Sequence, residues 1–349
     1  LKGNLKMKTI VVTGGSGFVA GWIIRELLTH DYKVRASLRD TSKAEEIGQG
    51  IMLLQPTTLS KNLSFFKADL TNDNGWDEGM KGGDGVIHVA SPLGHGTESV
   101  EEMVKVAKGG TLTVLKAAKD NHIKRIIMTS SEAASTPSIS VGEKTIDESF
   151  WSDIKNPELD AYRISKIEAE RAAWQYAKDN QLQLTTILPG AVFGPILSPD
   201  HLSSDEILLK LLNGERMIPK VPMEISDVRD LATLHRLALE KDVAIGHRFL
   251  AADQKLTMAE IAQIYQKQYP RLQLKFTYLP NWVTVLASKF SPSLRPLVPM
   301  LKRKYSHTTQ SAQKLLGWKQ RPVQKTITDA ADLLIFNKLV KNIPEKTYR

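Results

Sequence analysis

Short apolar runs alternate with longer segments of helical spacing over the first ~190 residues of the chain. Residues 9–13 (TIVVT) form one such run, as expected for a strand that is buried on both faces of a parallel sheet. The other strand-like runs span residues 33–38, 63–67, 86–90, 125–129 and 184–188, and the helical segments span 17–29, 100–120 and 161–179. This alternation predicts an α/β fold built on a doubly wound parallel sheet, in which ligands bind at the carboxyl ends of the strands.

The alternation becomes irregular after residue 193, where Pro, Leu, Lys and Ser become prominent. Helices are predicted there at residues 227–239, 258–266, 308–316 and 323–338, with a short strand at 247–251. We therefore expect a first domain over residues 7–193, to which residues 227–251 return. A smaller, mixed α/β C-terminal part is expected from residues 194–226 and 252–349. Residues 1–6 precede Met7 and are expected to be a cloning remnant or a disordered extension.

The composition is that of an ordinary globular protein, with 42% hydrophobic and 24% charged residues in 349. No apolar run approaches the ~20 residues of a membrane helix, and no signal peptide is recognised. The absence of cysteine excludes disulfides and thiolate chemistry and fits a cytoplasmic location. The net charge of +9 is spread along the chain without a nucleic-acid-binding motif, and its densest run, residues 302–304, is typical of a solvated surface.

Residues 13–20 (TGGSGFVA) join the first predicted strand to the first helix. Glycines allow a tight turn there and let backbone amides approach a pyrophosphate, while the helix N-terminus adds positive potential. The alternative is a plain glycine-rich turn. Because the motif lies between a strand and a helix, we predict a Rossmann-type dinucleotide site with contacts from Gly14, Ser16, Gly17, Phe18 and Val19.

The end of the second strand bears on which cofactor binds. An NAD enzyme usually places Asp or Glu there to hold the ribose hydroxyls, whereas this strand ends Ala36-Ser37-Leu38 and is followed by Arg39. Arg39 and Lys43 are placed to hold a 2′-phosphate, so NADP(H) is predicted rather than NAD(H). Two alternatives are that both are solvated surface cations, or that Asp40 pairs with Arg39 and weakens the site.

The ends of the third and fourth strands supply further predicted contacts. Asp69, followed by Leu70, is expected near the adenine amine, although it could instead cap the next helix. Val89, Ala90 and Ser91 are small enough to let the backbone pass close to the cofactor. His88 lies within the fourth strand and is expected to be packed and hydrogen-bonded rather than catalytic.

Tyr162 and Lys166 form the one Tyr-x-x-x-Lys pair in the chain and open the helix after the fifth strand. Residues four apart share a helix face, so the Lys ammonium is expected to lower the pKa of the Tyr phenol and let it exchange a proton near neutral pH. Ser130 and Ser131 end the fifth strand on opposite faces, and Ser131 is chosen as the one that orients a substrate oxygen. The alternative readings are a chance Tyr–Lys match and two serines that cap a turn.

With these motifs in place, the chain resembles the extended short-chain dehydrogenase/reductases. Within them it resembles the branch of dihydroflavonol reductases, cinnamoyl-CoA reductases and yeast methylglyoxal (ketone) reductases. The matching stretches are TGGSGFVAGW, YKVRASLRD, KADL, GVIHVASP, TSSEAAS, AYRISKIEAERAAW, ILPGAVFGP, SDVRDLATLHRLAL and LLGWKQRP.

The resemblance implies a catalytic triad of Ser131, Tyr162 and Lys166, and contacts from Pro189 and Val192 to the nicotinamide side of the cofactor. It implies hydride transfer to a carbonyl carbon, and a monomer or a homodimer. Plant flavonoid reductases carry an Asn shortly after the catalytic Ser, where this chain reads Glu-Ala-Ala-Ser-Thr from residue 132, so a polyphenolic substrate is not expected.

These features predict an NADP(H)-dependent carbonyl reductase that acts on a small-molecule aldehyde or ketone, with no nucleic-acid or membrane partner. The alternatives are an NAD-dependent sugar-nucleotide epimerase or dehydratase of the same fold and a non-enzymatic NADP(H)-binding regulator. The substrate pocket is expected between Ser131, Tyr162, the loop Pro92–Thr97 and the segment Phe193–Ile225. Its candidate lining residues are Leu93, Phe193, Ile196, Leu202 and Met217, each with ordinary packing as the alternative, and the candidate polar contacts are His95 and His201.

Overall fold

A seven-stranded parallel sheet organises the first two-thirds of the chain in this computed structural model, which describes residues 7–53, 57–93, 98–199, 202–290, 294–295 and 297–341. The strand order is β11-β7-β5-β4-β1-β2-β3, and every neighbouring pair is parallel. The strands are β1 (Thr9–Val12), β2 (Lys33–Leu38), β3 (Leu63–Lys67), β4 (Gly85–His88), β5 (Arg125–Thr129), β7 (Gln183–Leu188) and β11 (Arg248–Leu250). The predicted doubly wound sheet is confirmed, with the strand order reversing direction between β1 and β4.

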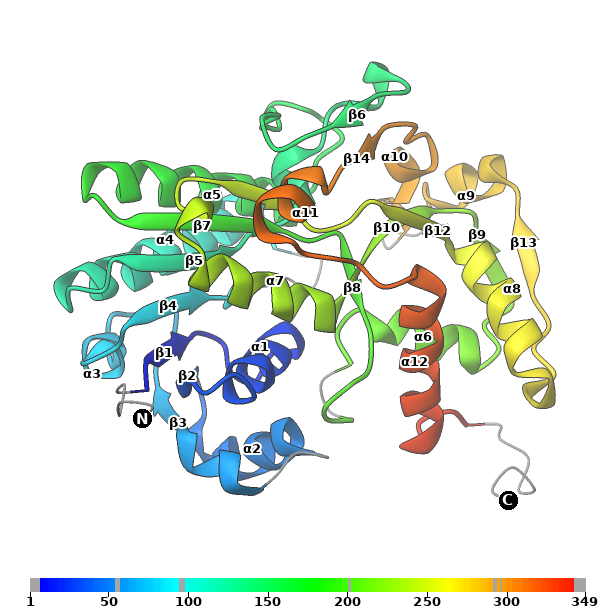
Figure 1. The fold of residues 1–349 in the computed structure, drawn as a ribbon. Helices are drawn as coiled ribbons and strands as arrows, with labels where there is room; N and C mark the ends of the chain where they lie inside the picture. Colours follow the sequence, from blue (N-terminus) through cyan, green and yellow to red (C-terminus); the bar gives the residue numbers. More distant parts are fainter. Residues whose placement is uncertain are drawn as a thin grey trace.

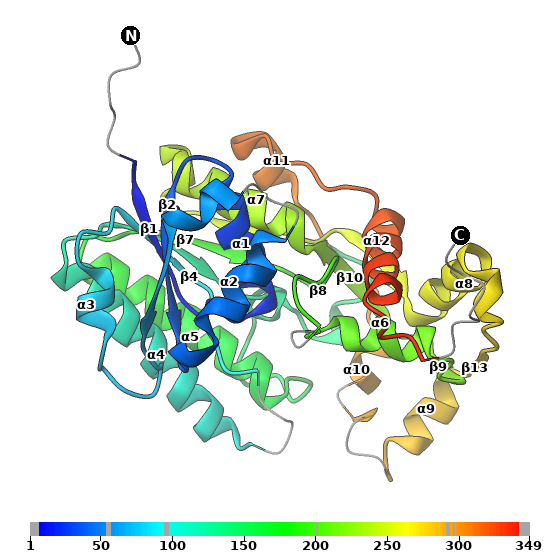
Figure 2. The same ribbon diagram turned by 90° about the horizontal axis from the view of Figure 1, so that it is seen from below.

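Helices cover both faces of this sheet (Figures 1 and 2). The apolar run of β1 explains why, since Ile10 and Val12 enter the core on one face while Val11 enters the core on the other. The first face carries α1 (Phe18–Leu28), α2 (Ala44–Met52), α7 (Val228–Glu240) and α11 (Gln310–Leu316), and the second carries α3 (Trp76–Met80), α4 (Val100–Asp120) and α5 (Ala161–Asp179). The strands β2, β3 and β5 and the helices α4 and α5 have the predicted bounds.

The C-terminal part has its own apolar core and a separate three-stranded sheet of order β12-β10-β8. The strands of this sheet are β8 (Ala191–Phe193), β10 (Pro222–Asp227) and β12 (Gln254–Thr257). Two further short pairs are formed by β9 (Met217–Pro219) with β13 (Thr277–Leu279), and by β14 (Ser306–His307) with β6 (Thr145–Ile146), which lies in the first part of the chain between β5 and α5. Its helices are α6 (Asp205–Leu212), α8 (Met258–Gln268), α9 (Asn281–Ala287), α10 (Leu297–Leu301) and α12 (Val323–Phe336). The small strands of this part were not among the predicted elements.

The chain crosses from one sheet to the other directly after β7. Pro189 and Gly190 separate β7 from β8, and Gly190 is required by close packing, because a Cβ there would lie 2.3 Å from the carbonyl oxygen of Glu224 on β10. The segment from α7 to β11 then returns, with β11 as the outermost strand beside β7. Within the described residues, no helix is both long enough and apolar enough to cross a membrane.

Candidate functional site

The glycine-rich turn between β1 and α1 is held against the ends of two other strands. The Gly14 amide donates to Ser37 Oγ (2.9 Å) and the Gly15 amide donates to the Ser37 carbonyl oxygen (2.8 Å) at the end of β2. Gly14 has φ +72°, and a Cβ there would meet the Cα of Ala90, beyond the end of β4, at 3.1 Å. A side chain at residue 14 would therefore push the turn away from the strand ends.

Helix α1 begins at this turn without a side-chain cap. Its N-cap is Gly17, so no side chain accepts a hydrogen bond from the first backbone amides of the helix. These amides remain able to donate to an anionic group bound at the helix N-terminus. A small open recess lies beside the turn, and its lining includes Gly15 to Phe18, Leu197 and Ser198. The side chain of Phe18 packs into the C-terminal core, so a contact from this residue to a ligand would come from its backbone amide.

Thr13 ties the turn to the end of β4. Its Oγ1 accepts hydrogen bonds from the amides of Val89 and Ala90, each at 3.0 Å, and therefore donates its own hydrogen to His88 Nδ1 (2.9 Å). His88 Nε2 then donates to Thr111 Oγ1 (3.1 Å). Burial, helped by the nearby Lys166 charge, lowers the pKa of His88 to about 3. His88 is thus a neutral structural residue.

The end of β2 presents two exposed cations, Arg39 and Lys43. Asp40 does not neutralise Arg39 within the described part of the chain. Its Oδ1 instead accepts from the amide and hydroxyl of Ser42, at 3.0 and 2.7 Å, and so caps a short 3-10 turn, Thr41–Lys43. Both predicted phosphate ligands are therefore exposed at the strand end, and the nearby charge of Lys43 helps to lower the pKa of Asp40.

Asp69 follows β3 and lies near enough to Arg39 to feel its charge. Its Oδ1 accepts from the amide (2.8 Å) and hydroxyl (2.7 Å) of Thr71, and these bonds, helped by the charge of Arg39, lower the pKa of Asp69. The N-cap of the next helix, α3, is Gly75, so Asp69 does not cap it. Leu70 packs against α4, where a Cβ on Gly110 would lie 2.7 Å from the Cβ of Leu70.

The two serines after β5 face different surroundings, as alternation predicts. Ser130 is buried and its Oγ donates to Glu170 Oε2 at 2.6 Å. Ser131 is half-buried, and its Oγ accepts from the amide of Ala133 (3.2 Å) at the start of a 3-10 turn, Glu132–Ser135. The hydroxyl of Ser131 retains its own hydrogen for donation.

Helix α5 places its first turns against the end of β5. Asp160 caps the helix by accepting from the Arg163 amide (2.8 Å), which sets Tyr162 in the first turn. One turn later, the buried Lys166 Nζ donates to the carbonyl oxygen of Thr129 (3.1 Å), the last residue of β5. This bond brings the face of α5 that carries Tyr162 and Lys166 to the strand end that carries Ser131.

The prediction that Lys166 lowers the pKa of Tyr162 is wrong when the side chains of the protein alone act on the phenol. Burial raises the pKa of Tyr162, Arg163 opposes this, and Lys166 makes no resolved contribution. The reason is that the Lys166 ammonium is turned to the β5 carbonyl and is itself desolvated. Burial lowers the pKa of Lys166 to about 8, against an opposing effect of the Glu170 carboxylate.

The segment after β7 borders the loop that carries Ser131. The carbonyl oxygen of the buried Pro189 accepts from the Glu132 amide (2.9 Å), and Val192 lies in β8 opposite Ser226. Both residues predicted to contact the nicotinamide side are therefore on the segment that joins the two sheets.

The predicted substrate-pocket residues are divided between core and surface. Phe193 and Ile196 are fully buried in the C-terminal core, so for them the packing alternative holds. Leu202 is half-buried, while Leu93 and Met217 are 69% and 64% exposed. His95, His201 and residues 94–97 of the predicted loop lie outside the described residues.

A second small, open recess lies beside the start of α5. Its lining includes Arg163, Thr136, Met300, Arg303 and Tyr305. Arg303 and Tyr305 belong to a C-terminal segment that sequence reasoning did not connect with the site. Arg303 lies in the run 302–304 that was expected to be solvated, yet its side chain is only 5% exposed, because side chains alternate along this extended segment.

Other residues that position the site were also missed. Glu170 is fully buried and accepts from Ser130, Thr186 (2.7 Å) and Arg248 (2.9 Å). Its place four residues after Lys166, on one helix face, was an available signal. The contact to Arg248, 78 residues away, had none.

Comparison with known proteins agrees with this geometry. A model of the NAD dependent epimerase/dehydratase family matches residues 10–252. The cinnamoyl-CoA reductase CAD2 of Medicago truncatula is 34% identical over 274 residues, which cover 76% of this chain and 82% of that protein. A bifunctional dihydroflavonol 4-reductase/flavanone 4-reductase of Malus domestica is 32% identical over 277 residues, covering 76% and 78%. The structure of yeast methylglyoxal/isovaleraldehyde reductase Gre2 complexed with NADPH superposes with a TM-score of 0.78 at 26% identity, covering 95% of this chain and 99% of that one.

The chain therefore belongs to the NAD dependent epimerase/dehydratase family. The predicted resemblance to extended short-chain dehydrogenase/reductases, and to the branch of plant and yeast reductases within them, is confirmed. The predictions of an enzyme and of a nicotinamide cofactor are confirmed at the level of the family.

Proposed function

We propose that this protein is an NADP(H)-dependent carbonyl reductase that converts an aldehyde or ketone to an alcohol, with Ser131, Tyr162 and Lys166 as its catalytic residues. The observation that carries the proposal is the Lys166 bond to the β5 carbonyl of Thr129, at 3.1 Å, which joins the Tyr–Lys face of α5 to the strand end before Ser131. A cytoplasmic location, a monomeric or dimeric state and the division into a cofactor domain and a substrate-binding part stay predictions.

The chain's own residues fit a phosphorylated dinucleotide. Gly14 keeps the turn against the strand ends, and the uncapped first turn of α1 offers amides to a pyrophosphate. No acid ends β2, and the exposed Arg39 and Lys43 suit a 2′-phosphate. The relatives support this choice, since the yeast Gre2 structure holds NADPH.

When bound, the nicotinamide supplies hydride, that is two electrons and one hydrogen nucleus, to the carbonyl carbon. Ser131 Oγ donates a hydrogen bond to the carbonyl oxygen and orients it. Tyr162 gives its phenolic proton to that oxygen as it gains charge, and the phenolate later recovers a proton from solvent. The products are the alcohol and the oxidised cofactor, so atoms and electrons balance.

The raised pKa of Tyr162 suits the reductive direction. Burial keeps the phenol protonated near neutral pH, which is the form that can act as an acid. Lys166, with its pKa lowered to about 8 by burial, carries a positive charge at neutral pH, and its bond to the Thr129 carbonyl oxygen holds this face of α5 at the end of β5.

The test is an NADPH-oxidation screen over α-keto esters, aryl ketones, diketones and aldehydes. Turnover of at least one class, with NADPH preferred to NADH, supports the proposal. The family also includes epimerases and dehydratases, so the same preparation is assayed for tightly bound NAD and for turnover of sugar nucleotides without added cofactor. Activity of that second kind, or NADPH binding without any turnover, would contradict the reductase assignment.

A further inference from the structure

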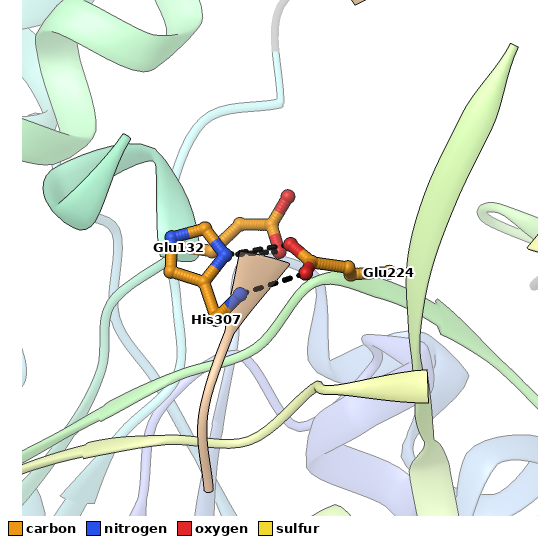
Figure 3. Close-up of side chains that lie close together, drawn as sticks. All are labelled: Glu132, Glu224 and His307. Atoms are coloured by element: carbon orange, nitrogen blue, oxygen red, sulfur yellow. Dashed lines mark hydrogen bonds and ion pairs between the residues drawn. The ribbon is translucent and has the colours of Figure 1, made fainter. Parts of the chain in front are cut away.

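Three titratable side chains, two of them buried and one half-buried, meet next to the loop that carries Ser131 (Figure 3). Glu132 comes from the 3-10 turn after β5, Glu224 from β10 and His307 from β14, and one ligand-type atom of each lies within 4.8 Å of the others. His307 Nδ1 is 2.6 Å from Glu224 Oε2 and 3.9 Å from Glu132 Oε2. Such a trio has the residue types of a metal site.

The charges around the trio match an ion-pair network better than a metal. His307 Nδ1 faces a carboxylate oxygen of Glu224 (2.6 Å) and Nε2 faces the Ser135 carbonyl oxygen (2.9 Å), and since both partners are acceptors, both ring nitrogens donate. Burial opposes the charged ring, but the hydrogen bonds and the charges of Glu132 and Glu224 together raise the pKa of His307. Arg303 pairs with Glu132 at 3.1 Å and Lys255 with Glu224 at 3.4 Å. Two carboxyl groups thus already lie among three cationic side chains, and burial raises the pKa of Glu132 despite the charge of Arg303, so a divalent ion would add further positive charge that these groups do not compensate.

The same contacts hold the loop that follows Ser131 from one side. Arg303 forms an ion pair with the Glu132 carboxylate of this loop, and His307 donates a hydrogen bond to the loop's Ser135 carbonyl oxygen. The backbone of β14 also pairs with β6, so His307 is fixed by its strand as well as by Glu224. The Glu132 Oε2 atom has no hydrogen-bond partner among the described residues and is buried, so the charge of Arg303 is its main compensation.

We propose that Arg303 and His307, with Glu132 and Glu224, form an ionic latch by which the C-terminal part positions Ser131. Arg303 and His307 are positioning residues in this role, which rests on the proposed carbonyl reduction. The latch acts on the transition state, because Ser131 must hold the carbonyl oxygen while the proton is transferred, and a displacement of about 1 Å is enough to lower turnover strongly. It leaves the glycine turn and the Arg39 end of the cofactor site untouched.

The experiment compares Arg303→Gln and His307→Gln with the parent enzyme. Arg303→Lys tests rescue, since an ammonium can still pair with Glu132. Arg236→Gln is the matched control, because Arg236 is also a little-exposed arginine (14%) and pairs with Glu26 at 2.8 Å between α7 and α1, away from the Ser131 loop. We expect both Gln variants to lower kcat at least ~10-fold with little change in the Kd for NADPH. Arg303→Lys should recover part of the lost kcat, and the Arg236→Gln control should keep the parental kcat.

Hydrogen–deuterium exchange gives a readout that does not need turnover. The amides of Ala133 and Ala134 bond to Ser131 (3.2 and 3.0 Å), and they should exchange at least ~10-fold faster in both Gln variants than in the parent or the control. If the parent reduces no carbonyl, the proposed function fails, while exchange still decides whether the latch holds the loop. The latch is wrong if the Gln variants keep parental kcat and exchange, or if the protein carries a stoichiometric divalent metal whose chelation abolishes activity.

Discussion

Replacing Lys166 by methionine should stabilise the fold at neutral pH while it abolishes turnover. Lys166 is 4% exposed and donates one hydrogen bond, to the Thr129 carbonyl oxygen. A methionine of similar length fills the same space without a charge. The variant therefore separates the free energy of burying an ammonium from the chemistry that the ammonium performs.

The magnitude follows from the pKa of Lys166, which burial lowers from 10.5 to about 8. The unfolded chain therefore holds the proton more tightly than the folded one, which lowers the stability of the parent by about 3 kcal/mol at pH 7. Loss of the hydrogen bond to Thr129 costs the variant about 1 kcal/mol, so a net gain of about 2 kcal/mol is expected.

The stability difference between the parent and the methionine variant should depend on pH in a definite direction. Because the folded pKa is the lower one, the stability of the parent rises as pH increases from about 8 toward 10.5, where the proton is lost from both states. At pH 10 the cost of the charge has fallen to about 1 kcal/mol, so the advantage of the methionine variant should disappear.

The assay is urea unfolding, followed by tryptophan fluorescence, of the parent and of Lys166→Met at pH 7 and pH 10. Lys178→Met is the control, since Lys178 is an exposed residue in the last turn of the same helix and should change stability by no more than about 0.5 kcal/mol. A Lys166 variant that is less stable than the parent at pH 7, or a difference that does not shrink with pH, would refute the reasoning.

The remaining predictions concern the pH profile, the cofactor and the packing of α4. Carbonyl reduction should decline above about pH 8 as Lys166 loses its proton, and Glu170→Gln, which removes a charge that raises the Lys166 pKa, should move this decline to lower pH in a kcat/KM profile. Arg39→Ala should raise the KM for NADPH ~10- to 100-fold and leave that for NADH nearly unchanged in steady-state assays, because one charge-assisted phosphate contact contributes about 1.5–3 kcal/mol. Gly109→Ala should raise the free energy of unfolding by about 0.5–1 kcal/mol, because nothing lies within 4 Å of the new Cβ. Gly110→Ala should lower the free energy of unfolding, because its Cβ would lie 2.7 Å from the side chain of Leu70, and denaturant titration of both variants measures the contrast.

The main sheet could be predicted because its signals are local. A buried parallel strand is a continuous apolar run and a long amphipathic helix repeats every 3.6 residues, so β2, β5 and α5 have the bounds that the pattern predicted. The glycine turn adds a motif whose physical requirement, a tight turn that lets backbone amides approach a pyrophosphate, can be stated from the sequence, whereas the contact of Gly14 with Ala90 appears only in the structure.

The C-terminal part could not be predicted in the same way. Strand β10 reads PMEISD and buries Glu224, a residue that is acceptable in a core only because His307, 83 positions later, donates to it. Arg303 shows the same limit, since a run of three cations is typical of a surface until a partner such as Glu132 is known.

The candidate site was predicted as a set of residue types, but its electrostatics were not. Spacing places Tyr162 and Lys166 on one helix face, yet only the fold shows that the ammonium turns to Thr129 and that burial dominates both pKa values. Desolvation depends on the packing around a group, which no local pattern records.

The measurement that tests the central claim most directly is turnover by Tyr162→Phe beside Tyr176→Phe. Both changes remove one hydroxyl from α5, but Tyr176 lies toward the far end of the helix. If Tyr162 supplies the proton, its variant loses at least ~100-fold in kcat while NADPH binding is kept, and the Tyr176 variant remains active. A Tyr162 variant that reduces the same carbonyl substrate at nearly the parental rate would contradict the account.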